Sequence, residues 1–247
     1  MRVKGALHVH SKLSRDGTMT IQELVRFYSR NGYQFLAMGE HAEDLDEAKV
    51  QALSKQSIEN SNGAFCVIPG IEFADNPVHI VGLGAIRLTR EKDPVAVAAK
   101  IREHGGLAVL AHPKRIGWKC PADVLLAVDA AEIWNVGYDG KYLPSIKALR
   151  GFRRMQQINP KLLAIASHDF HRTASFYDVA VEMDVETLTM DGILRNLRHG
   201  RYAIRSRFFR SDSGARLSRM EALSLYLLSS PLANMRKARS FFLRWSP

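Results

Sequence analysis

The sequence predicts an α/β barrel, and two observations carry this prediction. Short apolar segments typical of buried strands alternate with amphipathic segments typical of helices through residue 199. Histidines and acidic residues follow the carboxyl ends of most of these apolar segments. In a β/α barrel those ends meet around one mouth, whereas in a flat sheet they would be strung along an edge. With 247 residues the chain is long enough for one such barrel.

The expected elements can be taken in order. Strands are expected at the short apolar segments 3–8, 34–38, 65–71, 78–83, 107–111, 128–134, 162–166 and 179–183. Helices are expected between them at 20–32, 43–57, 93–105, 144–158 and 189–199. Thr20 and Glu23 have the spacing of a capping box, and Asp93 followed by Pro94 is typical of a helix start. Glycines at positions 32, 105 and 200 are typical helix stops.

The composition is that of an ordinary globular protein, with 46% hydrophobic and 24% charged residues. No apolar segment is long enough to span a bilayer, and no apolar leader precedes His8, so we expect no integral membrane segment and no secretory signal. Cys66 and Cys120 are the only cysteines, too few for a disulfide framework. We therefore expect a cytoplasmic protein.

The net charge of +10 is concentrated near the end of the chain. Residues 201–247 carry ten Lys and Arg against two acids, whereas residues 1–200 are nearly neutral. We expect a barrel over residues 1–205 and a basic helical extension over 206–247, with helices at 217–228 and 232–245. The extension either packs on the barrel with a solvated basic face, lies on a membrane surface or contacts nucleic acid.

The first candidate site residues are His8 and His10. Positions i and i+2 of a strand point to the same side, so these two imidazoles could face one metal ion. Alone the pair is weak, but seven further candidates strengthen it. The full set of candidate metal ligands is His8, His10, Asp16, His41, Glu72, His79, His112, Asp169 and His171.

Nine ligands are too many for one ion and suit two or three divalent ions, with Glu72 placed to bridge. Imidazoles and carboxylates without thiolates suit zinc, manganese or iron. Two or three such ions outweigh the three carboxylates, so the site is electropositive and favours an anion. Clustered divalent ions are suited to phosphoryl chemistry, since they activate water and hold the attacking and leaving oxygens.

The motif series resembles that of the PHP (polymerase and histidinol phosphatase) family, over roughly residues 1–205. The motifs stand in the family's order: H-x-H at His8 and His10, S-x-D-G with Asp16, E-H with His41, G-x-E with Glu72, H-I-V-G with His79, A-H-P with His112 and D-x-H with Asp169 and His171. The resemblance implies a distorted (β/α)7 TIM-like barrel that binds metal ions and hydrolyses phosphoesters.

The resemblance also implies how the ligands are shared among the ions. His8, His10, Glu72 and Asp169 would hold one ion, Glu72, His79 and His112 a second, and Asp16, His41 and His171 a third. In the last motif His168 replaces the more usual serine, and only seven residues separate Glu72 from His79. Neither departure removes a ligand.

Other polar residues have weaker assignments. Lys114 and Arg115 follow A-H-P, and a guanidinium fits phosphate oxygens well, so both are candidate substrate-binding residues; a solvated turn is the alternative. His104 and His199 stand at expected helix ends, where a cationic side chain is common. His168 either orients a neighbouring ligand or belongs to a plain loop.

The sequence therefore predicts a metal-dependent phosphoesterase in which a metal-bound hydroxide attacks small phosphomonoesters or nucleotide phosphates. No catalytic side chain is expected beyond the metal-bound water. The alternative within enzymes is a nuclease acting on nucleic-acid ends. A non-catalytic metal-binding module would be expected to lack ligands, and an amidohydrolase-type barrel commonly has a bridging lysine at a strand end, which no expected strand provides.

Overall fold

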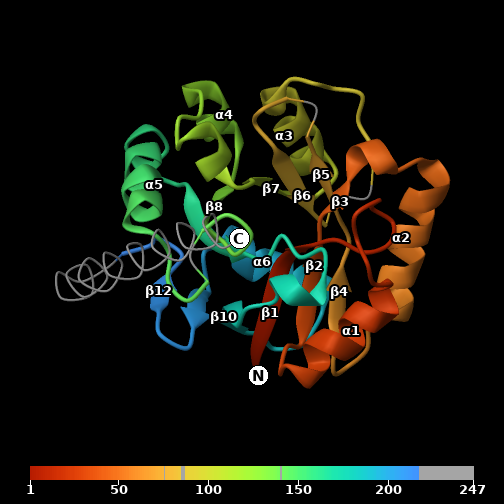
Figure 1. The fold of residues 1–247 in the computed structure, drawn as a ribbon. Helices are drawn as coiled ribbons and strands as arrows, with labels where there is room; N and C mark the ends of the chain where they lie inside the picture. The colour runs from red at the N-terminus through yellow and green to blue at the C-terminus, as the bar shows by residue number, and fades with distance from the viewer. Residues whose placement is uncertain (75, 85–86, 140, 217–247) are drawn as a thin grey trace, which may run out of the picture.

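The computed structural model describes residues 1–74, 76–84, 87–139 and 141–216, and Figure 1 shows their arrangement. Twelve described strands form two six-stranded sheets. The first has the order β12 (Arg210–Asp212), β11 (Ala203–Ser206), β10 (Val179–Asp184), β1 (Arg2–Val9), β2 (Phe35–Met38) and β4 (Cys66–Ile68). The second has the order β3 (Glu40–His41), β5 (Gly70–Phe73), β6 (Ile80–Leu83), β7 (Leu107–Leu110), β8 (Ala130–Asn135) and β9 (Leu163–Ser167).

The mixed α/β fold is confirmed, but the strands do not form the continuous ladder of a closed seven-stranded barrel. The two sheets meet where β3 follows β2 after Gly39 and where β5 follows β4 after Pro69. Proline has no amide hydrogen to donate to a ladder. A second junction lies beyond β9, where the amide of His168 donates to the carbonyl of Leu7 over 2.9 Å. The amide of His10 likewise donates to the carbonyl of Phe170 over 2.9 Å.

The sheets are also less parallel than the alternation of elements predicts. Strand β6 is antiparallel to both β5 and β7, and β10 is antiparallel to β1. Only residues 74–79 connect β5 to β6, which is too short for the crossover that a parallel pair needs. One consequence is that residues at the beginning of β10 lie beside the carboxyl end of β1.

Six described α-helices flank the sheets: α1 (Ile21–Arg30), α2 (Glu47–Glu59), α3 (Pro94–Glu103), α4 (Ala122–Ala127), α5 (Ile146–Ile158) and α6 (Met190–Arg198). Thr20 and Glu23 form the expected capping box, and Asp93 caps α3. Short 3-10 turns occur at Ala42–Asp44, Pro113–Ile116 and Thr173–Ser175. Helix α4 and the β11–β12 hairpin were not expected. The hairpin crosses the boundary expected at residue 205, and the expected helices at 217–228 and 232–245 lie outside the described residues.

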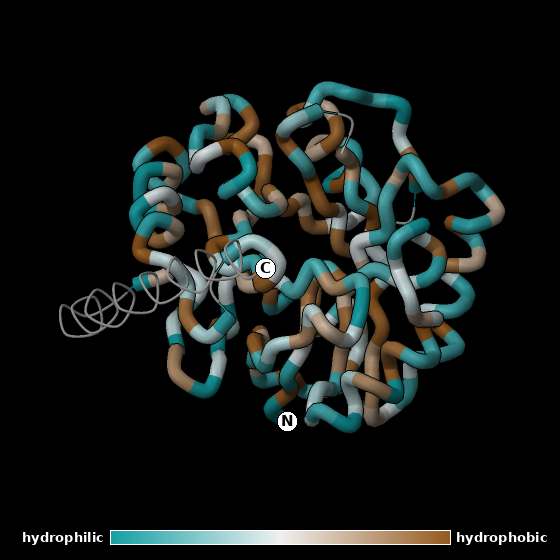
Figure 2. Tube along the Cα trace, in the orientation of Figure 1, coloured by the Kyte–Doolittle hydropathy of each residue, from teal (hydrophilic) through white to brown (hydrophobic). Residues whose placement is uncertain are grey.

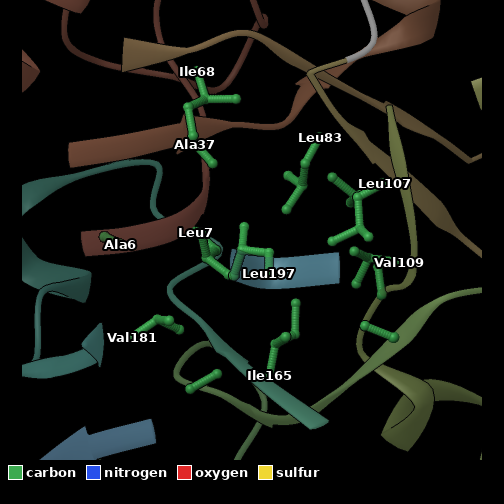
Figure 3. Packing of buried hydrophobic residues seen from close by; sticks show 14 of the residues in the cluster. Ala6, Leu7, Ala37, Ile68, Leu83, Leu107, Val109, Ile165, Val181 and Leu197 are labelled. Atoms are coloured by element: carbon green, nitrogen blue, oxygen red, sulfur yellow. The ribbon is translucent and has the colours of Figure 1, made fainter. Parts of the chain in front are cut away.

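The hydrophobic core lies between the two sheets. Leu7, Leu107 and Ile165 point into it from three different strands, and Leu197 enters from α6 (Figure 3). Hydrophobic residues follow the central strands while the outer turns are mainly hydrophilic (Figure 2). Among the described residues, no helix is long and apolar enough to cross a membrane. This packed core supports the carboxyl ends of the strands, where most of the candidate ligands lie.

Candidate metal centre

All nine candidate ligands lie in one connected cluster. Glu72, on β5, occupies its middle and is only 1% exposed. One carboxylate oxygen, Oε1, lies 2.8 Å from Nδ1 of His79 and 2.9 Å from Nε2 of His112. The other, Oε2, lies 3.2 Å from Nδ1 of His41 and 3.3 Å from Nε2 of His8. A single buried carboxylate therefore faces imidazoles on both sides.

The remaining candidates extend the cluster outward from Glu72. Nε2 of His10 lies 3.4 Å from Oδ1 of Asp169 and 3.8 Å from Oε2 of Glu72. Asp16 is half-exposed and lies 3.3 Å from both Nε2 of His41 and Nε2 of His171. The candidates therefore run from a closed interior at Glu72 to an open edge at Asp16.

Three groups of side chains bring their ligand atoms within 4.8 Å of one another. They are His8 with His10 and Glu72, Glu72 with His79 and His112, and His10 with His41 and His171. Two of these groups contain Glu72, as expected of a bridging ligand.

The spacing of these atoms fits shared divalent ions. Ligand atoms bound at the usual zinc distances in a tetrahedral site lie about 3.4 Å apart. The contacts of Glu72 and Asp169 with the imidazoles span 2.8 to 3.8 Å. In addition, both ring nitrogens of His10, Nδ1 of His41 and Nε2 of His171 are buried and make no hydrogen bond of good geometry, although carboxylate oxygens lie 3.2 to 3.4 Å from three of them. Buried polar atoms are normally paired, so these nitrogens have the character of open ligand positions.

The rings of His8 and His10 do lie together, with centroids 4.9 Å apart, but the predicted i, i+2 strand geometry does not bring them there. The register with β2 shifts between Leu7 and Val9, and His8 has a φ of 59°, so the regular i, i+2 geometry of a strand does not apply. His112 and Asp169 also have positive φ values, of 27° and 48°. Non-glycine residues rarely adopt this conformation, and such strain is concentrated at functional sites.

Asp16 is presented by a tight turn between β1 and α1. The carboxylate of Glu40 holds this turn, because it accepts hydrogen bonds from the backbone amide of Ser11 at 3.0 Å and from Oγ of Ser14 at 2.5 Å. Gly17 is required here, since a Cβ at this position would lie 1.9 Å from the carbonyl oxygen of Ser11. Glu40 was not among the expected site residues, although its place beside His41 in the E-H motif could have indicated it.

Burial and neighbouring charges shift the pKa values of the clustered residues in opposite directions. Burial favours neutral imidazole, and it lowers the pKa of His10 to about 4. Burial acts the same way on His41, but contacts with Glu72 and the charge of Asp16 outweigh it and raise the pKa of His41 to about 9. Burial should raise the pKa of Glu72, but the surrounding histidines hold it well below its ordinary value. Glu72 is thus an anionic candidate ligand at neutral pH.

The carboxylate of Glu132 lies behind the histidines and was also not expected. It accepts from the backbone amide of His112 at 2.7 Å and contacts Nδ1 of His8 at 2.8 Å. The sequence did carry a signal, because Glu132 is an acidic residue in the middle of the apolar segment 128–134, between Ala131 and Ile133.

Of the two candidate substrate-binding residues, Arg115 lies at the cluster and Lys114 is turned away. Nη1 of Arg115 is 3.2 Å from Nε2 of His79, and its side chain is exposed. Nζ of Lys114 donates instead to the carbonyl of Tyr138 and lies 3.6 Å from Asp139.

The other three histidines lie outside the cluster. His168 is buried between the hydroxyl of Tyr28, 2.7 Å from its Nδ1, and the carbonyl of Val179. Burial lowers the pKa of His168 to about 4, so it is a neutral core residue. His104 and His199 are the C-caps of α3 and α6.

No protein-family model and no curated protein matches the sequence. Solved structures do resemble the fold. A two-domain protein from Bacteroides vulgatus ATCC 8482, described as containing a PHP-like metal-dependent phosphoesterase, aligns over 92% of this chain and 69% of its own, with 16% identity and a TM-score of 0.66. The lesion-specific endonuclease Q of Pyrococcus furiosus aligns over 81% of this chain and 56% of its own, with 16% identity and a TM-score of 0.58.

An amidohydrolase from Chromobacterium violaceum aligns over 70% of this chain and 89% of its own, with 15% identity and a TM-score of 0.53. The chain therefore has the fold of PHP-like metal-dependent phosphoesterases, as the motif series predicts. At these identities the likeness concerns the fold, and the chain spans little more than half of the endonuclease.

Proposed function

We propose that this chain is a PHP-type metal-dependent phosphoesterase that hydrolyses small phosphomonoesters or nucleotide phosphates. The observation that carries the proposal is the position of Glu72, a buried carboxylate shared by two groups of imidazoles. We assign His8, His10, Glu72 and Asp169 to one ion, Glu72, His79 and His112 to a second, and Asp16, His41 and His171 to a third. Zinc, manganese and iron all fit this donor set.

Divalent ions bound there supply activated water and stabilise charge on the phosphoryl oxygens. The chain itself contributes the rest. Arg115, beside His79, is placed to hold a phosphate oxygen with its guanidinium. Asp16 and His171 lie at the half-exposed edge of the cluster, where a substrate enters. Burial raises the pKa of the Cys66 thiol to about 11 and that of Cys120 to about 12, so neither cysteine is suited to act as a nucleophile.

One observation favours a second candidate, a nuclease acting on nucleic-acid ends. We define the aromatic rim as Tyr138, Tyr142, Tyr177 and Phe208, of which Tyr177 is half-buried and the other three are exposed. Tyr138 lies against His112, with ring centroids 4.9 Å apart. The ring of Tyr142 lies 6.1 Å from that of Tyr177 and 6.4 Å from that of Phe208. Tyr138 thus lies at the candidate metal centre, and the other three rings form a group that reaches the turn between β11 and β12.

Cationic side chains accompany these rings. Nζ of Lys141 lies 4.6 Å over Tyr177, and the guanidinium of Arg207 lies 5.3 Å from the centre of the Phe208 ring. Exposed rings interleaved with cations are typical of surfaces that bind single-stranded nucleic acid. An endonuclease Q complex, which also shares this fold, holds a 27-mer duplex with an abasic lesion at its active site. The same surface suits the base and phosphates of a nucleotide.

Other functions fit the site less well. The nine candidate ligands include no lysine of the kind that bridges the ions of many amidohydrolases. A non-catalytic module would be expected to lack ligands, but all nine candidates are in contact within the cluster.

The test is a phosphate-release screen on metal-loaded protein with sugar phosphates, nucleotides, nucleoside bisphosphates and short oligonucleotides. The first proposal predicts release from at least one small phosphomonoester. The nuclease candidate predicts oligonucleotide cleavage with a KM that rises steeply with salt, since phosphate contacts release counterions.

A double variant, Tyr142→Ser with Phe208→Ser, separates the two candidates. It should raise the KM for an oligonucleotide tenfold or more and leave that for a sugar phosphate, which has no base, unchanged, because stacking on an aromatic ring contributes about 1–3 kcal/mol per base. Leu126→Ser is the matched control, since Leu126 on α4 is 62% exposed, as is Phe208.

A further inference from the structure

Glu132 is a buried carboxylate that lies behind the candidate metal centre. It stands in β8 (Ala130–Asn135), is 1% exposed, and is the single charged residue of that strand. An ionised carboxylate in such a place is costly unless several donors surround it. The neighbours of Glu132 therefore indicate why it is there.

Three groups face its two oxygens. Oε1 lies 2.8 Å from Nδ1 of His8, while Oε2 accepts from the backbone amide of His112 at 2.7 Å and from Nδ2 of Asn135 at 2.8 Å. The amide of His112 and the side-chain nitrogen of Asn135 are donors. A carboxylate only accepts, so the contact with His8 places a hydrogen on Nδ1 of that ring.

This arrangement fixes which nitrogen of His8 is available. With Nδ1 hydrogen-bonded to Glu132, the free nitrogen is Nε2, which lies 3.3 Å from Oε2 of Glu72 and 3.8 Å from Oδ1 of Asp169. Histidines that bind metal ions usually donate their other N–H to such a partner, which orients the ring.

The second contact acts on the backbone of His112. The φ of 27° at His112 is unfavourable for a residue with a Cβ. Its amide is held by Glu132, and its side chain then reaches Oε1 of Glu72, 2.9 Å from Nε2. Glu132 therefore restrains one histidine through its ring and another through its backbone.

Asn135 supports Glu132 from the same strand. Residues three apart in a regular strand point to opposite faces, but the register of β8 with β9 shifts between Glu132 and Trp134. This irregularity lets Nδ2 of Asn135 reach Glu132 and approach Oδ2 of Asp169 at 3.5 Å.

We propose that Glu132 is a positioning residue that couples the two halves of the metal centre. His8 belongs to one of the two groups of candidate ligands that contain Glu72, and His112 belongs to the other. Glu72 joins these groups on the ion side, and Glu132 joins them from behind. The inference rests on the proposed metal centre but not on the identity of the substrate.

The experiment compares Glu132→Gln and Glu132→Asp with the wild type. Glutamine has the same shape, but its amide nitrogen would place a donor where a carboxylate oxygen of Glu132 now accepts a hydrogen bond. Aspartate keeps the charge but is too short to reach both His8 and the amide of His112. Asp129→Asn is the matched control, since Asp129 also accepts a backbone amide, that of Ala108 at 2.8 Å, away from the cluster.

Metal-stripped proteins are titrated with Zn²⁺ against a chromophoric chelator, and Co²⁺-loaded proteins are compared by their visible absorption. Glu132→Gln should weaken binding of Zn²⁺ by about 10–100-fold and change the Co²⁺ spectrum, with a smaller effect in Glu132→Asp. Asp129→Asn should change neither. Unchanged affinity and spectrum in a folded Glu132 variant, or an equal loss in Asp129→Asn, would overturn the proposal.

The two Glu132 variants guard against loss of folding. If Glu132→Gln does not fold, the affinity and spectrum of Glu132→Asp decide the proposal by the same criteria. The outcome is also separable from the proposed function. Zn²⁺ binding that depends on Glu132, without hydrolysis of any phosphate ester by the wild type, would refute the phosphoesterase and leave the positioning role intact.

Discussion

Replacing Glu72 by glutamine perturbs the metal centre at its middle. The substitution keeps the shape of the side chain and removes the negative charge that faces His8, His41, His79 and His112. Glu72 belongs to two of the three candidate ligand groups, so its loss takes one ligand from each. We expect the metal content to fall to at most one ion per chain.

The size of the expected losses in stability and in kcat/KM follows from two properties of Glu72, its burial and its place in two groups of candidate ligands. Its side chain is 2% exposed, so solvent screens it little. Removing one partner of a buried charged pair typically costs about 3–5 kcal/mol, and we expect a loss of this order in the stability of the metal-free protein. If two ions act together on the phosphoryl group, disabling both sites lowers kcat/KM by roughly 10³-fold, or about 4 kcal/mol.

The assay is metal content by elemental analysis together with kcat/KM on the best phosphate ester from the screen. Asp129→Asn controls for loss of a carboxylate outside the cluster. A Glu72→Gln protein with its full metal content and unchanged kcat/KM would refute the bridging role and with it the proposed arrangement of ions.

Three further predictions follow from the same structure. Arg115→Ala should lower kcat/KM at least tenfold, about 1.4 kcal/mol, without loss of metal, because it removes a phosphate contact. The control Lys119→Ala, in the same exposed segment, should leave kcat/KM unchanged. Equal kcat/KM values for the two variants would argue against a phosphate contact of Arg115. His168→Leu should cost about 1–3 kcal/mol in the free energy of unfolding, because it leaves the buried hydroxyl of Tyr28 unpaired, while metal content stays unchanged; a loss of metal would contradict its role in the core. The chelator-treated protein should lose thermal stability as the pH rises from 6.5 to 9, because the pKa of His41 is raised to about 9 in the folded protein. The positive charge of His41 stabilises the fold fully below pH 6.5, its pKa in the unfolded chain, and this stabilisation is lost as the pH rises through the pKa in the folded protein. Zn²⁺ should remove this decline in melting temperature, since binding needs neutral imidazole; a melting temperature that rises with pH in chelator would refute the assignment.

The convergence of seven of the nine candidate ligands could be predicted from sequence because these seven stand at or just beyond the end of an apolar strand segment, and strand ends converge. His41 and Glu72 lie in β3 and β5, and Asp169 follows β9. This reasoning needs only the order of elements and not their exact geometry. It therefore brought seven residues together even though the strands form two sheets and not one continuous ladder, whereas it does not apply to Asp16, in a turn, or to His79, just before β6.

The local conformations could not be predicted in the same way. The positive φ values of His8, His112 and Asp169 depend on long-range hydrogen bonds, such as that from the amide of His112 to Glu132, twenty residues away. Side-chain periodicity assumes regular backbone, so it cannot indicate a bulge at His8. Glu40 and Glu132 were missed for a related reason, because a buried acid acquires its partners only in the folded chain.

The most direct test of the metal-dependent phosphoesterase is one titration of the metal-stripped protein, in which bound metal and phosphate release are followed together as Mn²⁺ or Zn²⁺ is added. The account predicts that hydrolysis of a phosphate ester appears with the binding of the second ion and saturates at two or three ions per chain. Binding of two or three ions without hydrolysis of any ester in the screen, or full hydrolysis by metal-free protein, would contradict it.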